Sequence, residues 1–408
     1  MKIYRAIALT GALALAGSVW HAPTAPRAVG RLGIGTGPFV AGSRIALRAT
    51  GMPVPYDVRL VGPGTLAAGV YVAPNVTSPQ RVALIAGNAA ILAAASFLVV
   101  PAPARSRPLL AVASYDDGIV LHDPNGFARL AVLAIDGSPG DVAFGPRGII
   151  QAPDTVGDGV AIASRTPWNV RIVNDVPSGN EIVVDGQSDA FVSNRDVNGA
   201  GALTKIAADG TVSRIVTGVT AEGLAIDRAR GIVYVGNVND ATVLAVNART
   251  MKPLRRIAAV PRVFGIALST DGNTLYAVAN RSLSSPFHQA GYVAAIALSA
   301  TPHVVARSAN LHFPLGIALD ARDARLFVTD EASNQVYVLN AKTLRASHAP
   351  LDTCRTPWKP FYDAASQRVF VPCARADDVD VFDARTLARV GGAPFHTGGY
   401  PLAVAAWH

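Results

Sequence analysis

The chain has 408 residues, of which 50% are hydrophobic and only 16% are charged. This length allows two or three domains, and the composition is typical of a β-rich chain and excludes extensive disorder. The 36 basic residues outnumber the 28 acidic ones, which gives a net charge of +8, but they are scattered and form no cluster. A nucleic-acid-binding protein would concentrate its cations in a patch or along one helix, so we expect no nucleic acid among the partners.

The N-terminal residues predict an exported protein. Lys2 and Arg5 precede an apolar stretch over residues 7–17, and small residues follow. This order is typical of a secretory signal peptide, which we place at residues 1–22 with a cleavage site between 16 and 22. The protein is therefore predicted to be secreted, periplasmic or at the cell surface.

Residues 29–100 alternate strand-like runs with Gly and Pro turns, which predicts a small β-sandwich. Within them, residues 82–100 have only Asn88 and Ser96 as polar members and are long enough to cross a membrane. Gly87 and Asn88 are typical of a turn, so two strands are the preferred interpretation and membrane association is the alternative. The Pro-rich residues 101–108 predict a stiff, extended linker.

Residues 109–408 contain a repeat. Each unit begins with an apolar strand near a Gly or Pro, followed by a polar turn, a second strand ending in Asn or Asp, and a third strand. Successive units are separated by 40, 42, 42, 51, 44 and 41 residues when aligned on equivalent apolar positions, which are Val142, Ile182, Leu224, Ile266, Ile317, Phe361 and Leu402. This period is typical of the four-stranded blades of a β-propeller.

The two ends of the repeat region complement each other. The first strand that contains Leu402 ends the chain without companions, whereas residues 109–114, 119–122 and 129–135 form three strands that lack a first one. Pairing them completes one blade and leaves no open edge. We therefore predict an all-β fold: a seven-bladed β-propeller closed by pairing of the C-terminal strand with the N-terminal blade, and preceded by the small β-sandwich.

Three second strands carry a recognisable motif. Ile232-Val-Tyr-Val-Gly-Asn237, Leu275-Tyr-Ala-Val-Ala-Asn280 and Leu326-Phe-Val-Thr-Asp330 resemble the YVTN repeat of bacterial and archaeal surface or secreted propellers. The resemblance extends over residues 109–408 and is weak between 141 and 180. Residues 69–74, Gly-Val-Tyr-Val-Ala-Pro, resemble a segment of bacterial immunoglobulin-like domains.

The YVTN resemblance implies an architecture and no single activity, because propellers of this type differ widely in function. Related six-bladed lactonases and sugar-acid hydrolases use a central metal held by carboxylates and amides. A metal-dependent, lactonase-like hydrolase or lyase is therefore the enzymatic hypothesis for this chain.

The preferred hypothesis is non-catalytic binding. The turns that lead into the first strands, here called the leading turns, are expected at one end of the central channel, which is the default site of a propeller. They carry aromatic and cationic residues, a mixture that suits a glycan, a peptide or a protein partner. The predicted ligand-binding residues are Arg262, Phe264, His312, Phe313, Trp358, Lys359, His396 and Tyr400, with His288 from a longer loop after Asn280. Packing of the aromatic residues between blades is the alternative interpretation.

The second strands end in Asn or Asp in six of seven repeats, at Asp116, Asp154, Asn194, Asn237, Asn280 and Asp330. Under the enzymatic hypothesis their oxygens would hold Ca²⁺ or another divalent metal. The competing interpretation is that these side chains accept hydrogen bonds within their own turns. The binding hypothesis requires no cofactor.

Two further pairs of residues stand out. Glu181 and Glu222 are the only glutamates at or just before first strands, where a carboxylate would face the channel or lie in a solvated turn. Cys354 and Cys373 are the only cysteines. In an oxidising compartment they are predicted to form a disulfide, with two free thiols as the alternative.

Overall fold

The computed structural model describes residues 31–34, 37–50, 57–87, 92–135, 137–165, 167–197, 199–280, 291–322 and 324–408. Apart from one 3₁₀ turn at Pro146–Gly148, the regular structure of these residues is β-strand, so the predicted all-β class is confirmed. Within these residues no helix is long and apolar enough to span a membrane. The predicted signal peptide and His288 lie outside the described residues.

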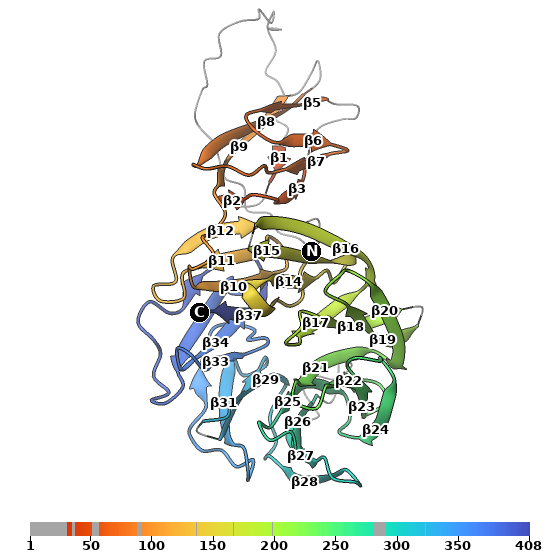
Figure 1. The fold of residues 1–408 in the computed structure, drawn as a ribbon. Helices are drawn as coiled ribbons and strands as arrows, with labels where there is room; N and C mark the ends of the chain where they lie inside the picture. The colour runs from red at the N-terminus through yellow and green to blue at the C-terminus, as the bar shows by residue number, and fades with distance from the viewer. Residues whose placement is uncertain are drawn as a thin grey trace, which may run out of the picture.

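Six separate antiparallel sheets of four strands follow one another along the described chain and surround a common centre (Figure 1). The first three are β13 (Ala143–Phe144), β14 (Ile150–Pro153), β15 (Asp158–Arg165) and β16 (Trp168–Pro177); β17 (Gly179–Val184), β18 (Ala190–Val197), β19 (Ala200–Ile206) and β20 (Val212–Gly218); and β21 (Ala221–Asp227), β22 (Ile232–Asn237), β23 (Thr242–Asn247) and β24 (Pro253–Ala258). The next three are β25 (Val263–Leu268), β26 (Thr274–Ala279), β27 (Tyr292–Ala297) and β28 (His303–Arg307); β29 (Pro314–Asp320), β30 (Arg325–Asp330), β31 (Gln335–Asn340) and β32 (Leu351–Asp352); and β33 (Phe361–Asp363), β34 (Arg368–Cys373), β35 (Asp378–Asp383) and β36 (Phe395–His396).

A seventh set of four strands joins the two ends of the repeat region. β37 (Pro401–Trp407) pairs with β10 (Leu109–Ser114), which is followed by β11 (Gly118–His122) and β12 (Arg129–Leu133). The pairing of β37 with β10 is antiparallel, with Val404 opposite Val112. The predicted pairing of the C-terminal strand with the N-terminal blade is therefore confirmed.

The N-terminal strands extend this seventh set into an eight-stranded sheet. β2 (Phe39–Val40), β9 (Leu92–Val100), β8 (Gln80–Gly87) and β5 (Asp57–Val61) continue it beyond β12. The other N-terminal strands form two small sheets, β1 (Arg31–Gly33) with β4 (Arg48–Thr50), and β3 (Arg44–Ala46) with β7 (Val70–Val72) and β6 (Thr65–Ala67). β8 and β9 are antiparallel, with Val82 opposite Phe97, so residues 82–100 form parts of two strands, as preferred from the sequence.

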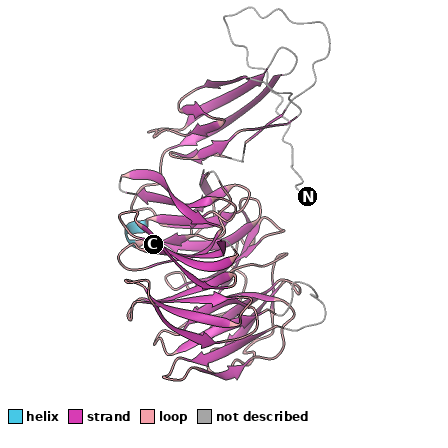
Figure 2. Cartoon of the chain, turned by 90° about the vertical axis from the view of Figure 1, so that its right-hand side faces the viewer, coloured by secondary structure: helices cyan, strands magenta, loops and turns pink. Residues whose placement is uncertain are grey.

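Side-chain contacts reinforce the junction between the N-terminal strands and the other sheets. The hydroxyl of Ser43 donates to the carbonyl of Val132 at 3.0 Å and accepts from the amide of Ala134 at 3.2 Å. The indole Nε1 of Trp168 donates to the carbonyl of Ala41 at 2.7 Å. Figure 2 shows the N-terminal strands lying directly against the end of the larger β-structure. The N-terminal strands are thus held by specific hydrogen bonds as well as by the chain connection.

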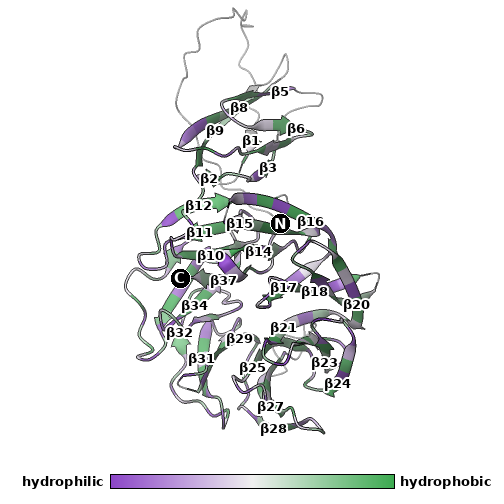
Figure 3. Ribbon diagram, in the orientation of Figure 1, coloured by the Kyte–Doolittle hydropathy of each residue, from purple (hydrophilic) through white to green (hydrophobic). Residues whose placement is uncertain are grey.

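Apolar side chains from neighbouring sheets form the core. One cluster joins Phe191 and Leu203 from β18 and β19 to Val233 and Leu244 from β22 and β23, and all four are buried. Figure 3 shows the strands as mostly hydrophobic and many of the turns as hydrophilic. Blades pack face to face in this way because each sheet buries both of its surfaces against its neighbours.

The scattered arginines have a structural role. Several donate from one sheet to a backbone carbonyl of a sequence-neighbouring sheet: Arg228 to Val184 at 2.7 Å, Arg255 to Ser299 at 2.7 Å, Arg325 to Ala384 at 2.8 Å, and Arg368 to Pro124 at 3.0 Å. Because the arginines serve one interface each, they are distributed along the chain instead of forming a basic patch.

Candidate channel site

The innermost strands of six sheets bring equivalent residues together at one end of the central channel. In six of the seven repeats the residue two positions before the aligned apolar residue lines a common pocket: Gly140, Asn180, Glu222, Phe264, Leu315 and Lys359. Glu181, Arg195, Gly265, Gly316 and Trp358 complete its wall. Equivalent positions of six sheets therefore meet at this pocket, and each sheet contributes a different residue type to it.

The inner strands can approach one another because small residues lie between them. A β-carbon on Gly223 would be only 2.2 Å from the carbonyl oxygen of Phe264, and one on Gly316 would be 2.4 Å from Cδ of Pro360. Real β-carbons do not tolerate such contacts. Glycine at these positions lets β21 approach β25 and lets β29 approach the leading turn of β33. The resulting pocket has a free volume of about 30 Å³, enough for a water molecule or two.

Lys359 links the leading turn of β33 to the sheets that begin with β13 and β17. Its ammonium lies 2.6 Å from Oδ2 of Asp141 and 3.1 Å from Oε2 of Glu181. Asp141 precedes β13, Glu181 belongs to β17, and Lys359 precedes β33. Both carboxylates also accept backbone hydrogen bonds, Asp141 from Ile182 at 3.0 Å and Glu181 from Leu224 at 3.0 Å. The three side chains are therefore fixed relative to one another.

A second ion pair lies next to the first. Nε of Arg195, from β18, is 2.8 Å from Oε1 of Glu222, and a guanidinium nitrogen donates to Oε2 at 3.2 Å. The side-chain amide of Asn180 also donates to Oε2 of Glu222. The Glu222 side chain is 8% exposed and that of Arg195 is 43% exposed. Asn180 thus positions Glu222, and Glu222 in turn holds the partly exposed Arg195 at the pocket.

Burial controls the ionisation of this cluster. Burial raises the pKa of Glu181, and the neighbouring Asp141 carboxylate raises it further, while the ammonium of Lys359 opposes both. Burial also raises the pKa of Glu222 against the opposing effect of Arg195. Burial disfavours the ammonium of Lys359, but Asp141 and Glu181 outweigh it and hold the Lys359 pKa above its ordinary value. The site therefore keeps a charged lysine beside Glu181, whose raised pKa means that it takes up a proton more readily than in water.

The structure brings three of the predicted ligand-binding residues to the pocket, namely Phe264, Trp358 and Lys359. Of the others, His288 lies outside the described residues, and the remaining five lie elsewhere on the leading turns. Arg262 has its Nε buried, and the backbone amides of His312 and Phe313 donate to Asp330 at 2.8 and 3.0 Å. His396 contacts Asp378 at 3.3 Å, and the ring of Tyr400 packs against that of Tyr115 at 6.1 Å.

The proposed metal ligands are engaged in local hydrogen bonds. Asp154 accepts from the amides of Ser138 and Val156 at 2.9 and 3.1 Å, and Asp330 accepts from Ser333 at 3.1 Å. Asn194 donates to the carbonyl of Pro177 at 2.7 Å and accepts from Thr204 at 2.7 Å. Asn237 donates weakly to the carbonyl of Val235 at 3.5 Å, and Asp116 and Asn280 are the remaining members of the predicted set. Among the described residues no three His, Cys, Asp or Glu side chains gather into a group that could hold a metal ion. Such local hydrogen bonds are expected of Asn and Asp side chains that close their own turns, and a metal held by this set stays a prediction.

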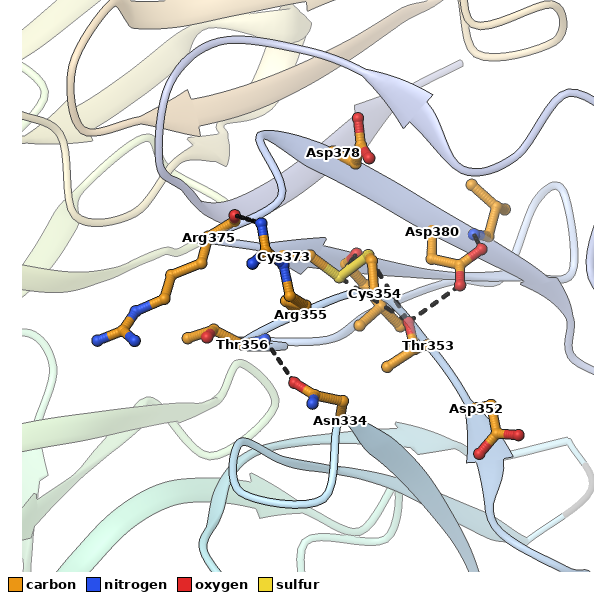
Figure 4. Close-up of a disulfide and its surroundings, with 12 residues drawn as sticks. Asn334, Asp352, Thr353, Cys354, Arg355, Thr356, Cys373, Arg375, Asp378 and Asp380 are labelled. Atoms are coloured by element: carbon orange, nitrogen blue, oxygen red, sulfur yellow. Dashed lines mark hydrogen bonds between the residues drawn. A yellow bond between two sulfur atoms is a disulfide. The ribbon is translucent and has the colours of Figure 1, made fainter. Parts of the chain in front are cut away.

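The predicted disulfide between Cys354 and Cys373 is present, with Cα atoms 5.7 Å apart (Figure 4). It ties the leading turn of β33 to the end of β34. Trp358 in the same turn donates its amide to Pro372 at 2.8 Å, and its carbonyl accepts from the hydroxyl of Thr329 at 2.5 Å. The disulfide and these hydrogen bonds fix the turn that carries Trp358 and Lys359 into the pocket.

Sequence reasoning missed Asp141, Asn180 and Arg195 as site residues. Asp141 lies one position before the aligned apolar residue of its repeat, as Glu181 does, and Asn180 lies two positions before, as Glu222 does. Comparing these two positions in all repeats would have found both residues. Arg195 follows the Asn that ends the second strand of its repeat. Its place at the pocket depends on the geometry of β18, and no sequence signal marks it.

The comparisons with known proteins concern the fold. No family model and no curated protein matches the chain. Solved structures do: a protein of Bacteroides fragilis provisionally named a 6-phosphogluconolactonase aligns with a TM-score of 0.60 and 11% identity, covering 75% of this chain and 100% of its own. The periplasmic gluconolactonase of Pseudomonas aeruginosa aligns with a TM-score of 0.57 and 14% identity, covering 73% and 98%. The Kuenenia stuttgartiensis hydrazine synthase aligns with a TM-score of 0.57 and 13% identity, covering 69% and 95%.

The chain is a β-propeller. The four-stranded antiparallel sheets around one centre and the matches to these structures agree on this point. At these identities the comparisons show the fold and no activity, and the names of the neighbours describe different chemistry.

Proposed function

We propose that the chain is an exported, seven-bladed β-propeller of the YVTN type that hydrolyses lactones at its channel site. Seven sets of four strands, one of them closed by β37, support the blade number. The small N-terminal sheets support an immunoglobulin-like sandwich, and the disulfide suits an oxidising compartment outside the cytosol. The proposal replaces non-catalytic binding as the preferred function.

The observation that carries the enzymatic proposal is the pairing of buried carboxylates with partly exposed cations in one pocket. Buried glutamates with a raised pKa are suited to take a proton from water. Cations at the opening are suited to stabilise a developing oxyanion. A purely structural role explains these ion pairs less well. Apolar residues can commonly replace a buried ion pair without loss of stability, so the fold alone does not require one.

In the proposed reaction Glu181 is the general base. Its side chain is 17% exposed, against 8% for Glu222. The contacts of Glu181 with Lys359 and Leu224 both use Oε2, whereas Arg195 and Asn180 engage both carboxylate oxygens of Glu222. Because the pocket admits a water molecule or two, we place the attacking water inside it and the lactone ring at its opening, over Trp358. Glu181 takes a proton from this water while its oxygen bonds to the lactone carbonyl carbon.

The carbonyl electron pair moves to its oxygen, which faces the ammonium of Lys359. Collapse of this intermediate breaks the ring C–O bond, and the proton held by Glu181 passes to the departing ring oxygen. The product is the open hydroxy acid. No step in this scheme is assigned to the Asn and Asp residues at the strand ends.

Non-catalytic binding remains the second candidate, because Phe264, Trp358 and Lys359 were predicted as binding residues and line the same pocket. The two candidates differ in turnover. A pH-stat assay of purified protein with γ- and δ-lactones is expected to show catalysed acid release that Glu181→Gln abolishes. Saturable lactone binding without acid release would favour the binding function instead.

A further inference from the structure

The charges in the pocket restrict what kind of lactone it can accept. The cluster contains three carboxylates, Asp141, Glu181 and Glu222, and two cations, Lys359 and Arg195, so its formal charge with all five groups ionised is two minus three, or −1. Each cation already lies within 3.2 Å of at least one carboxylate oxygen. Neither cation is left over to neutralise a charged substituent.

A phosphorylated sugar lactone would bring about two negative charges to this pocket. Proteins bind such groups with unpaired arginines, lysines or backbone amides. Here the phosphate would have to separate Lys359 or Arg195 from its carboxylates and leave Asp141 or Glu222 buried without a counter-charge. Leaving a buried charge unpaired is strongly unfavourable.

The large uncharged side chains of the lining are apolar. Phe264, Leu315 and Trp358 line the pocket together with the charged residues. They come from three successive repeats, so they form one continuous side of the opening. This side offers contact area and no complementary charge.

Two exposed valines lie at the same end of the channel. Val156, 64% exposed, is in the turn after β14, which is tied to the leading turn of β13 because the amide of Thr155 donates to Ser138 at 2.9 Å. Val219, 46% exposed, is in the leading turn of β21, three residues before Glu222. Both are thus apolar side chains exposed to solvent at the end of the channel where the leading turns lie.

We propose that the substrates are uncharged lactones that carry an apolar substituent. The inference rests on the proposed function. The lactone ring lies over the pocket opening, and the substituent extends across the apolar side and the valines at the rim. The substrate class thus differs from the phosphorylated sugar lactones suggested by the name of one structural neighbour.

The test compares three substrates on the full exported chain. These are δ-valerolactone, a δ-lactone with a six-carbon alkyl chain, and 6-phosphogluconolactone. We expect kcat/KM for the alkyl lactone to exceed that for the phosphorylated lactone by at least tenfold. Val156→Ser together with Val219→Ser should lower kcat/KM for the alkyl lactone several-fold and leave that for δ-valerolactone unchanged. Val305→Ser, an exposed valine on the outer strand β28, is the matched control and should change neither.

Three results are decisive in different ways. Hydrolysis of none of the three lactones would overturn the proposed function itself. A preference for the phosphorylated lactone would leave the function standing and overturn the inference about charge. Equal loss for both uncharged lactones in the double valine variant, or no loss, would overturn the role of the apolar rim.

Discussion

Replacing Lys359 with methionine should destabilise the fold, because Asp141 and Glu181 would remain buried without their shared counter-charge. The Asp141 side chain is 4% exposed and that of Lys359 is 29% exposed. Removing one partner of a buried ion pair typically costs 3 to 5 kcal/mol. Since Lys359 retains some contact with water, we expect the lower end, a loss of about 3 kcal/mol in the free energy of unfolding.

Urea unfolding followed by circular dichroism at pH 7 measures this loss. Lys342→Met is the matched control, because Lys342 is exposed, and it should change the stability by less than about 0.5 kcal/mol. Adding Asp141→Asn to Lys359→Met should recover part of the loss, because one uncompensated charge is then removed. A loss in Lys359→Met no larger than that of the control would refute the reasoning that the ion pairs are buried and coupled.

Three further predictions concern stability. Burial lowers the pKa of His122 to about 4 from an ordinary value of 6.5, so the contribution of His122 to stability is complete above pH 6.5 and is lost as the pH falls toward 4. His122→Gln should therefore reduce the loss of unfolding free energy between pH 7 and 4.5 by about 2.4 kcal/mol in urea titrations. The same substitution at the exposed His348 should leave that loss unchanged. Replacing Cys354 and Cys373 with serine together should lower the unfolding free energy by about 3 kcal/mol under oxidising conditions, and an unchanged midpoint would contradict the linking role of the disulfide. Ser43→Ala should cost about 1 to 3 kcal/mol, because it leaves the amide of Ala134 without its partner, and a neutral effect would argue against the junction as described.

Much of the fold could be predicted from the repeat in the sequence. The aligned apolar positions fall on or next to the inner strands, and the lone C-terminal strand was correctly paired with β10 because an open edge would be unfavourable. The weakest repeat is also the least regular sheet: β13 has two residues, the 3₁₀ turn at Pro146–Gly148 follows it, and β16 is extended to ten. Proline and glycine interrupt the pattern there, so local sequence gave little guidance.

Long-range contacts were beyond sequence reasoning. β2 is only two residues long, and its pairing with both β12 and β9 depends on how the N-terminal strands dock. The channel site was found in part, because Phe264, Trp358 and Lys359 were selected for their residue types. The partners of Lys359 lie about 180 to 220 residues away in sequence, and only closure of the ring brings them together. The site's charge balance could not be read before those pairs were known.

The most direct test of the central claim is the initial rate of lactone hydrolysis in a pH-stat for the wild-type chain and Glu181→Gln at pH 7. Glutamine keeps the shape of the side chain and its acceptor for the amide of Leu224. We expect the wild-type chain to catalyse hydrolysis and the variant to lose at least a hundredfold in kcat, with an unchanged circular dichroism spectrum. A wild-type rate equal to the spontaneous rate, or a variant as active as the wild type, would contradict a catalytic channel site.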